Sequence, residues 1–326
     1  MHSDLVELGW TDQQWNRISS VVAEEAQKAR VAAQILPLVG PVDPTTVAVA
    51  PYTLTARPNP NAVSARAPQY RLTVDSDPNL FLTQIAVNVP LRTREAADPD
   101  LTAALGMFRR AANYIARIED ALIFNGRAGP HQLPPFGGTG IPNVVQITGD
   151  GAVDGIFSFI GPWGGRALIN VNAIPAAGLV LGDQVVTAIV QAINRLDANG
   201  QLGPYSCVLS PHLFEAICTP NANLVLPRDR ILPFLQGPLL RSSAIFQGPQ
   251  AQMPVTVAWG VVIATSGNPV ELVVAHEIGV RYLQTTEEPR LVFRISERVA
   301  LRIKEPQSIA QLQWAAEPGK KGKLHV

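Results

Sequence analysis

The longest continuous amphipathic pattern in the chain lies between Asp98 and Gly126. Apolar residues recur there every three or four positions, which is the spacing of one helix face. Asp98 and Pro99 are typical of a helix start, and Asn125 followed by glycine is typical of a helix end. The pattern predicts a helix over 99–125, roughly 40 Å long. It is either the core helix of an ordinary α+β domain or the spine of an elongated subunit.

A second amphipathic pattern begins at Thr11 or Asp12 and continues to Leu36. Pro37 then ends it, because proline removes a backbone donor and restricts the residue before it. The pattern predicts an N-terminal helix within residues 1–42. Its apolar residues form two strips, so the helix packs on its own domain with one strip and offers the other to a partner, or buries both.

Residues 43–96 favour extended structure. Apolar and polar residues alternate over Tyr70–Val74 and again over Leu80–Val89, and a polar, proline-rich stretch precedes the first run. The segment predicts a long two-stranded arm that has little core of its own. A hairpin that cannot bury itself is expected to lie on another surface, here a neighbouring subunit.

The second half of the chain divides into three predicted parts. Residues 127–182 contain short apolar runs between glycines and prolines, so they predict an elaborated connection that belongs, with the long helix, to a region over 97–182. Residues 183–275 predict a mainly separate domain of helices and buried strands. Residues 276–314 are rich in strand-forming residues and predict a return to the sheet that packs on the long helix.

Three smaller expectations concern this C-terminal region. Ser296-Glu297 interrupts an alternating strand and predicts a β-bulge. The pair His276-Glu277 predicts a hairpin turn between strands. The basic tail over 315–326 predicts disorder.

The charge balance argues against a strongly charged partner. Lys and Arg total 26, as do Asp and Glu, so a nucleic acid is not an expected partner. Charged residues make up only 16% of the chain and hydrophobic residues 47%. This composition indicates either a large core or a surface buried against other subunits.

The sequence also favours a cytoplasmic protein. No apolar run reaches the roughly 18–20 residues of a membrane helix, and the first residues lack the pattern of a signal peptide. Cys207 and Cys218 are more typical of reduced thiols than of a disulfide framework.

Motifs for catalysis are absent from the sequence. The five histidines lack metal-ligand spacing, and no CxxC, GxSxG, P-loop or GxGxxG motif occurs. His276 beside Glu277, and Cys207, are the residues on which a hydrolase would have to depend. We therefore predict no enzymatic activity, and no catalytic, cofactor-binding or metal-binding residue.

Four segments, in this order, resemble the encapsulins, the linocin-like shell proteins of bacterial and archaeal nanocompartments. They are AAQILPLVGPV, IARIEDALIFNG, NGQLGPYSCVLSPHLFEAI and RISERVALRIKEPQSI. The chain departs from the family at Pro37, where many members carry an acidic residue, and residues 127–182 are longer than the usual connection.

The resemblance implies the α+β coat-protein fold of the HK97 phage, with an N-terminal helix, an extended β-arm (the E-loop), a peripheral domain around the spine helix and an apical domain. It further implies a closed icosahedral shell of 60 subunits or a multiple, without catalysis by the shell. The enclosed cargo would be an enzyme, such as a ferritin-like protein or a peroxidase. Its C-terminal targeting peptide would occupy a luminal groove beside the N-terminal helix.

By position, the resemblance assigns residues to two sites. The groove candidates are Ile18, Val22, Ile35, Leu36, Val299 and Leu301, each of which is equally compatible with an ordinary core position. The candidates for the loop around a five-fold pore are Asn221, Ala222 and Asn223.

Two alternatives stay open. A phage or prophage major capsid protein has the same fold, although the chain begins with the cargo-type helix and shows no long charged leader. A hydrolase or bacteriocin-like protein is the second alternative, and it requires a functional His276 or Cys207.

Overall fold

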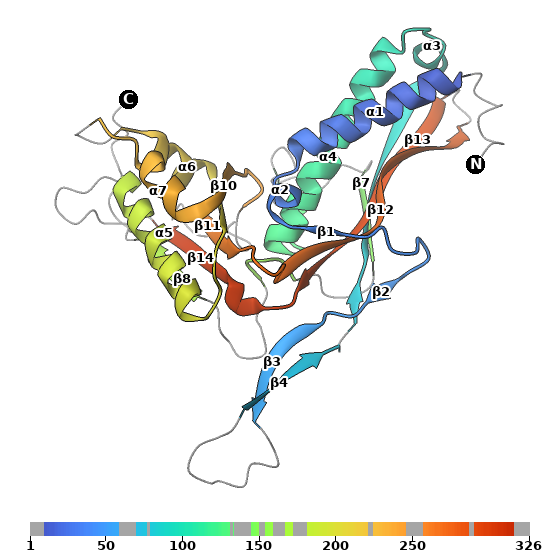
Figure 1. The fold of residues 1–326 in the computed structure, drawn as a ribbon. Coiled ribbons are helices and arrows are strands. Elements are labelled where there is room, and N and C mark those ends of the chain that lie inside the picture. Colours follow the sequence, from blue (N-terminus) through green and yellow to red (C-terminus); the bar gives the residue numbers. More distant parts are fainter. Residues whose placement is uncertain are drawn as a thin grey trace.

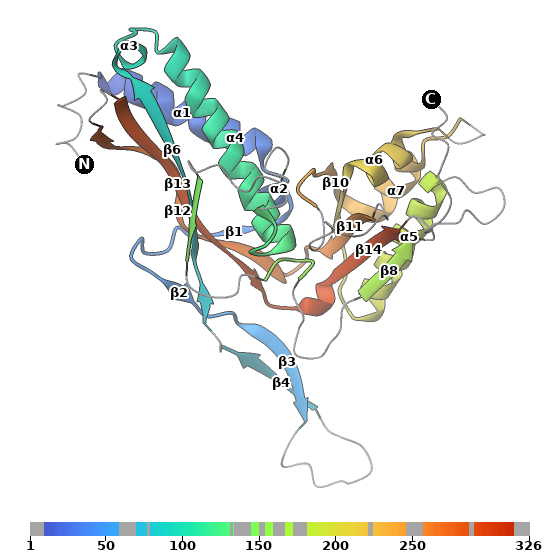
Figure 2. The ribbon, with the colours of Figure 1, turned by 180° about the vertical axis from the view of Figure 1, so that it is seen from behind.

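The computed structural model describes residues 10–58, 70–76, 79–130, 133, 145–149, 154–158, 167–171, 181–220, 224–245, 257–286 and 290–315. Within these ranges the chain forms two lobes, each built on a five-stranded sheet, and a hairpin that projects from the body (Figures 1 and 2). Most of the predicted elaborated connection over 127–182 lies outside the described residues, as does the tail after residue 315.

The first lobe is a long sheet with helices on one face (Figure 1). In spatial order its strands are β1 (Leu38–Val39), β12 (Val270–Thr285), β13 (Arg290–Ile303), β6 (Thr83–Arg92) and β7 (Val145–Thr148). Helices α1 (Asp12–Ala29) and α4 (Thr102–Asn125) pack together against this sheet, and the one-turn helix α3 (Thr93–Ala96) links β6 to α4. The sheet is antiparallel except for the parallel pair of β1 and β12.

The long helix is confirmed, but it starts three residues later than predicted. Asp98 accepts hydrogen bonds from the backbone N–H of Asp100 and of Thr102, at 3.1 and 3.0 Å. Leu101, which has a left-handed backbone and a fully buried side chain, separates this turn from α4. The apolar face is anchored by Phe108, whose ring meets that of Phe293 edge-on with centroids 5.4 Å apart. The helix is therefore the centre of the first core.

The N-terminal helix is shorter than predicted. Thr11 and Gln14 form a capping box at its start, but α1 ends at Ala29, and a separate turn, α2 (Ala32–Ile35), follows. The break occurs at Arg30, whose backbone is extended. Apolar periodicity alone does not reveal it, because side chains before and after the break both reach the core.

The second lobe also consists of a sheet and helices. Its strands lie in the order β10 (Gln236–Arg241), β9 (Tyr205–Leu209), β11 (Val257–Ala264), β14 (Ile309–Ala315) and β8 (Ala167–Val171). One face packs on α5 (Leu181–Ala198), α6 (Pro211–Cys218) and α7 (Pro227–Leu235). The other face, with Val208, Trp259 and Val261, packs on the end of α4 through Ile123 and Phe124. A shared core thus joins the two lobes.

This arrangement corrects two predicted boundaries. Strand β14 was expected within residues 276–314 to return to the sheet of the long helix, but it lies in the second sheet, as does β8 from the predicted region 97–182. A 3₁₀ turn at Pro306–Ser308 redirects the chain between the sheets. The chain therefore enters the second lobe again after β13.

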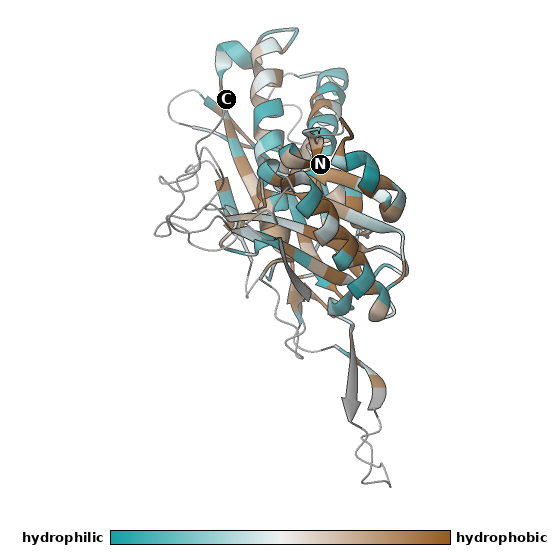
Figure 3. Ribbon diagram, turned by 90° about the vertical axis from the view of Figure 1, so that its left-hand side faces the viewer, coloured by the Kyte–Doolittle hydropathy of each residue, from teal (hydrophilic) through white to brown (hydrophobic). Residues whose placement is uncertain are grey.

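The predicted arm is also shorter than expected. Its projecting part is the hairpin of β3 (Thr53–Pro58) and β4 (Tyr70–Asp75), which extends well away from the body (Figure 3). The short strands β2 (Ala48–Val49) and β5 (Leu80–Phe81) pair at its base. Residues 83–92 of the predicted arm instead form β6, which pairs with β13 in the first sheet.

The arm has a fixed base and exposed apolar side chains along its strands. Leu54 donates its backbone N–H to the carbonyl of Lys304 at 2.7 Å, and the guanidinium of Arg302 lies 5.2 Å from the Tyr52 ring centroid. Val74, opposite Leu54, is exposed, and Leu72 farther along β4 is 83% exposed. Apolar side chains of the arm therefore lack cover from their own subunit.

The predicted bulge and turn are wrong. Strand β13 pairs with β6 without interruption through Ser296 and Glu297, and Glu297 lies on the same buried face as Ile295 and Val299. The irregularity is on β12, where the register shifts on either side of His276, so this residue lies within a strand instead of a hairpin turn. In the sequence, the charged Glu297 at a buried position resembles a change in register.

Candidate functional site

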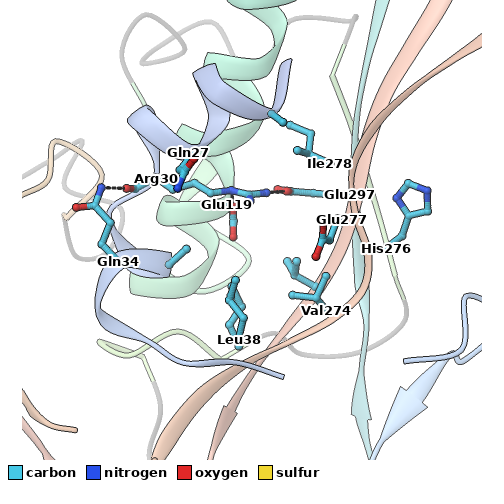
Figure 4. A pocket seen from close by; sticks show the side chains of 14 residues that line it. Gln27, Arg30, Gln34, Leu38, Glu119, Val274, His276, Glu277, Ile278 and Glu297 are labelled. Carbon is cyan, nitrogen blue, oxygen red and sulfur yellow. Dashed lines mark hydrogen bonds and ion pairs between the residues drawn. The ribbon is translucent and has the colours of Figure 1, made fainter. Parts of the chain in front are cut away.

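A groove of about 480 Å³ lies between the N-terminal helices and the first sheet (Figure 4). Helix α1 forms one wall through Ala23 and Gln27, together with Arg30 directly after the helix, and strands β12 and β13 form the opposite wall. The remaining lining residues are Ala33, Gln34, Leu38, Glu119, Leu272, Val274, His276, Glu277, Ile278, Glu297 and Val299. Half of the lining residues are apolar and half are polar or charged, so the groove combines apolar contact surface with convergent hydrogen-bonding groups, as binding sites do.

Arg30 organises the polar part of this groove. Its backbone N–H donates to the carbonyl of Ala26 at 2.9 Å and closes α1. Its guanidinium forms ion pairs with Glu119 on α4 and Glu297 on β13 (Figure 4). One side chain at the helix break therefore ties three elements together.

Asp120, adjacent to Glu119, fixes the start of α2. Its carboxylate accepts hydrogen bonds from the backbone N–H of Val31 at 3.0 and 3.1 Å and of Ala32 at 2.8 Å. These donors belong to the first turn of a helix and have no partner within it. The side chain of α4 supplies that partner, so the geometry of the break depends on Asp120.

Burial disfavours the ionised form of these carboxyl groups. It raises the pKa of Asp120 to about 7, although the hydrogen bonds from Ala32 and Val31 lower it. It raises the pKa of Glu119 well above its usual range, and the negative charge of Glu297 adds to this effect while Arg30 opposes it. Burial likewise raises the pKa of Glu297, again against the effect of Arg30.

The pKa of the neighbouring guanidinium is also raised, but for a different reason. Burial lowers the pKa of Arg30, but the charges of Glu297 and Glu119 outweigh burial and raise it overall. Two buried carboxyl groups therefore share one permanently positive group. Glu119 Oε1 and Glu297 Oε1 have no hydrogen-bond partner within the described structure. The arrangement holds elements together and presents hydrogen-bonding oxygens at the groove, but it contains no activated nucleophile.

The structure places the six predicted groove residues in the core. Ile18 and Val22 pack in the core beneath α1, and Ile35, Leu36 and Leu301 pack in the core between the lobes. All five are buried and none lines the groove. Val299 is also buried, yet it lines the groove wall. The positions that face the groove are neighbours of the predicted ones.

The other residues singled out in the sequence have varied positions. Asn221, Ala222 and Asn223 lie outside the described residues. His276 is exposed on β12, and Cys207 is buried in β9, where burial raises its thiol pKa. Across the described ranges, no cluster of three His, Cys, Asp or Glu residues is suited to a metal ion.

The lining residues missed in the sequence had a weak signal. Arg30, Glu119 and Glu297 are charged, and apolar periodicity assigns charged residues to a solvated face. The alternation of Ile295, Glu297 and Val299 could have revealed one of them, because it keeps Glu297 on the buried face of β13.

Among helices in the described part of the chain, none is long and apolar enough to cross a bilayer.

Comparison with known families gives a match over most of the chain. Residues 8–133 and 168–300 match the Linocin_M18 family, whose description is "Encapsulating protein for peroxidase". The unmatched residues 134–167 fall inside the predicted elaborated connection. A characterised relative, the type 1 encapsulin shell protein EncA of Myxococcus xanthus, is 26% identical over 313 residues and covers 93% of both chains.

Solved structures with a similar fold include particles of two kinds. The virus-like particle of Pyrococcus furiosus has a TM-score of 0.54 at 13% identity and covers 92% of this chain and 99% of its own. The capsid of Myoviridae phage XM1 has a TM-score of 0.52 at 11% identity and covers 86% and 90%. At these identities the similarity shows the fold alone, which is an α+β fold of the HK97 type.

Proposed function

Because this chain belongs to the Linocin_M18 family of encapsulating proteins, we propose that it is the shell subunit of an encapsulin nanocompartment that self-assembles and encloses a cargo enzyme. The observation that carries the proposal is the family match over residues 8–133 and 168–300, which includes both walls of the groove. The family is one of structural shell proteins, so the prediction of a non-enzymatic chain is confirmed.

Features of the subunit support assembly. The projecting hairpin carries Leu72, Val74 and Leu54 as exposed apolar side chains, and α7 carries exposed Leu232 and Phe234. Exposed apolar residues on an extended arm are expected to be covered by another surface. Neighbouring copies of the same chain would provide that surface. A closed icosahedral particle of 60 subunits or a multiple is the assembly that we propose.

We place the cargo contact in the groove beside α1. Its walls enclose a volume of about 480 Å³, which suits a short peptide segment. The C-terminal targeting peptide of the cargo is the proposed occupant, and the cargo is a peroxidase or a ferritin-like enzyme. Two free cysteines among the described residues agree with the proposed cytoplasmic location.

Negative-stain electron microscopy of the purified protein tests this function directly. Round, closed particles of uniform diameter are the expected result, and a protein that stays monomeric at micromolar concentration would contradict it. Co-expression with a candidate cargo then tests enclosure. The cargo should co-purify with the particles and become resistant to protease, whereas cargo without its last residues should not.

A phage-type capsid is the second candidate, since the phage XM1 capsid matches the fold almost as well as the Pyrococcus furiosus particle does. The two kinds of particle differ in what they enclose. Particles with a nucleic-acid absorbance spectrum and nuclease-protected DNA would favour the capsid, and particles with protein alone would favour the nanocompartment.

A further inference from the structure

We propose that the face of the first sheet opposite α1 and α4 contains a binding site for a phosphate-type oxyanion, formed by Arg281, Arg298 and His276. Alternation along β13 separates this face from the helix-covered one, because Phe293 and Ile295 lie in the core with α4. Even-numbered positions of β13 therefore point to the other side. This pocket borders the cargo groove, because His276 and Glu297 line both.

A concave surface exists at this position. A pocket of about 390 Å³ is lined by Pro44, Gln84, His276, Gly279, Val280, Arg281, Ser296, Glu297 and Arg298. The register of β12 against β13 shifts on either side of His276, so the strand is locally irregular there. A Cβ atom added at Gly279 would lie 3.2 Å from the ring of His276, so the glycine leaves room beside the ring.

The guanidinium groups of Arg281, Arg294 and Arg298 have no carboxylate partner among the described residues. Arg298 donates to the carbonyl of Pro44 at 3.1 Å, and Arg294 donates to the amide oxygens of Asn88 and Gln146 at 3.0 and 3.1 Å. The side chain of Arg281 makes no hydrogen bond or ion pair within the described ranges. All the oxygens bound are neutral, so the positive charges stay uncompensated.

Another arginine of the same strand shows the contrast. Arg302, farther along β13, forms an ion pair with Glu271 on the adjacent strand. At the pocket the cross-strand neighbours are instead Arg281 opposite Arg294 and His276 opposite Arg298. Like charges directly opposite each other, as those of Arg281 and Arg294 are, destabilise a sheet. An anion bound between them would remove that repulsion.

Glu297 does not supply the missing negative charge. Its side chain is fully buried on the helix side of the sheet, where it is paired with Arg30. The side chains of Gln84 and Ser296 add neutral hydrogen-bond donors to the pocket. Guanidinium groups bind phosphate oxygens in a bidentate manner, and a pocket of this volume has room for a phosphate or a diphosphate. A phosphate-type oxyanion therefore matches both the charge and the donors.

Calorimetric titration of the assembled, full-length particle with pyrophosphate at low ionic strength tests the proposal. We expect saturable binding near one equivalent per subunit. Arg281→Gln and Arg298→Gln should each weaken it about tenfold, because each removes a charge-assisted hydrogen bond. The matched control is Arg195→Gln, which removes an exposed arginine on α5 and should leave the affinity unchanged.

Two results would overturn the site. One is the absence of saturable binding to the wild-type particle, which includes the case in which a neighbouring subunit covers the pocket. The other is equal weakening by Arg195→Gln, which would indicate attraction by net charge alone. A parallel titration with inorganic phosphate distinguishes a single phosphate from a longer oxyanion. Micrographs of each variant show whether the particle is intact.

Discussion

Arg30 at the end of α1 and Glu297 on β13 form an ion pair although 267 positions separate them in the sequence. The same guanidinium also pairs with Glu119 on α4. Removing it leaves two buried carboxyl groups without a positive partner, and the loss of one member of a buried ion pair typically costs about 3–5 kcal/mol. Arg30→Met should therefore lower the free energy of unfolding by an amount of this order at pH 8, as measured by guanidinium denaturation.

The control for this prediction replaces all three members of the cluster. In the triple variant Arg30→Met, Glu119→Met and Glu297→Met, no buried charge is left unpaired, so most of the stability should return. If the single variant proves as stable as the triple one, the cluster does not hold α1 to the sheet in the way inferred.

This cluster also shows which structural features can be predicted from the sequence and which cannot. The spine helix and strand β9 follow directly from apolar periodicity, because their side chains face one continuous core. The break at Arg30 does not, because it depends on Asp120, which is 89 and 88 positions from the backbone groups that it binds. Local patterns carry no information about such a distant partner.

The groove residues show a related limit. Sequence position pointed to the surface beside the N-terminal helix and the last long strand, where the structure has a groove, but it selected apolar residues such as Ile18 and Leu301 that fold into the core. The exposed residues of the groove wall include Ala23 and Gln27, which carry little hydrophobic signal. Only the three-dimensional arrangement distinguishes the wall of a groove from the core behind it.

Stability should depend on pH through Asp120. Its pKa rises on folding from 3.8 to about 7, so the folded chain binds more protons than the unfolded chain between these values. Stability from this group is complete below about pH 4 and is lost as the pH rises through 7. Arg30, Glu119 and Glu297 face the same cluster, and the raised pKa values of both glutamates act in the same direction.

The measurement is the thermal midpoint at pH 5 and at pH 8. The wild-type thermal midpoint should be lower at pH 8 than at pH 5. The midpoint of Asp120→Asn should decrease less, because the amide does not titrate but still accepts the hydrogen bonds of Val31 and Ala32. Equal decreases in the two proteins would mean that other groups cause the pH dependence.

The core under the spine helix should be essential for assembly. Phe108 is fully buried and packs against Phe293. Phe108→Asp places an unpaired charge in that core and should prevent folding of the first lobe, so soluble particles should be lost. Phe108→Leu is the milder control, with a cost of about 1–2 kcal/mol and intact particles in micrographs. Intact particles from Phe108→Asp would show that the helix does not organise the subunit.

The arm should act between subunits. Leu72 is 83% exposed on β4, so Leu72→Lys removes no core contact within the subunit. The variant should fold normally by circular dichroism and yet assemble poorly, because a charge would meet the neighbouring surface. Lys28→Leu, an exposed change of the opposite kind on α1, serves as the control for altered charge. Normal assembly of Leu72→Lys, judged by size-exclusion chromatography, would argue against an intersubunit role of the arm.

Filling the groove should separate cargo loading from shell formation. Ala23 is exposed on α1 and lines the groove, so Ala23→Trp occupies part of its volume of about 480 Å³ without entering the core. We expect particles of normal appearance with at least about tenfold less co-purified cargo, since a blocked site loses the apolar contact on which peptide docking depends. The matched control is Ala103→Trp on α4, an exposed alanine that does not line the groove. Undiminished cargo in Ala23→Trp particles would place the docking site elsewhere on the subunit, while loss of cargo from both variants would point to a general effect of the added ring.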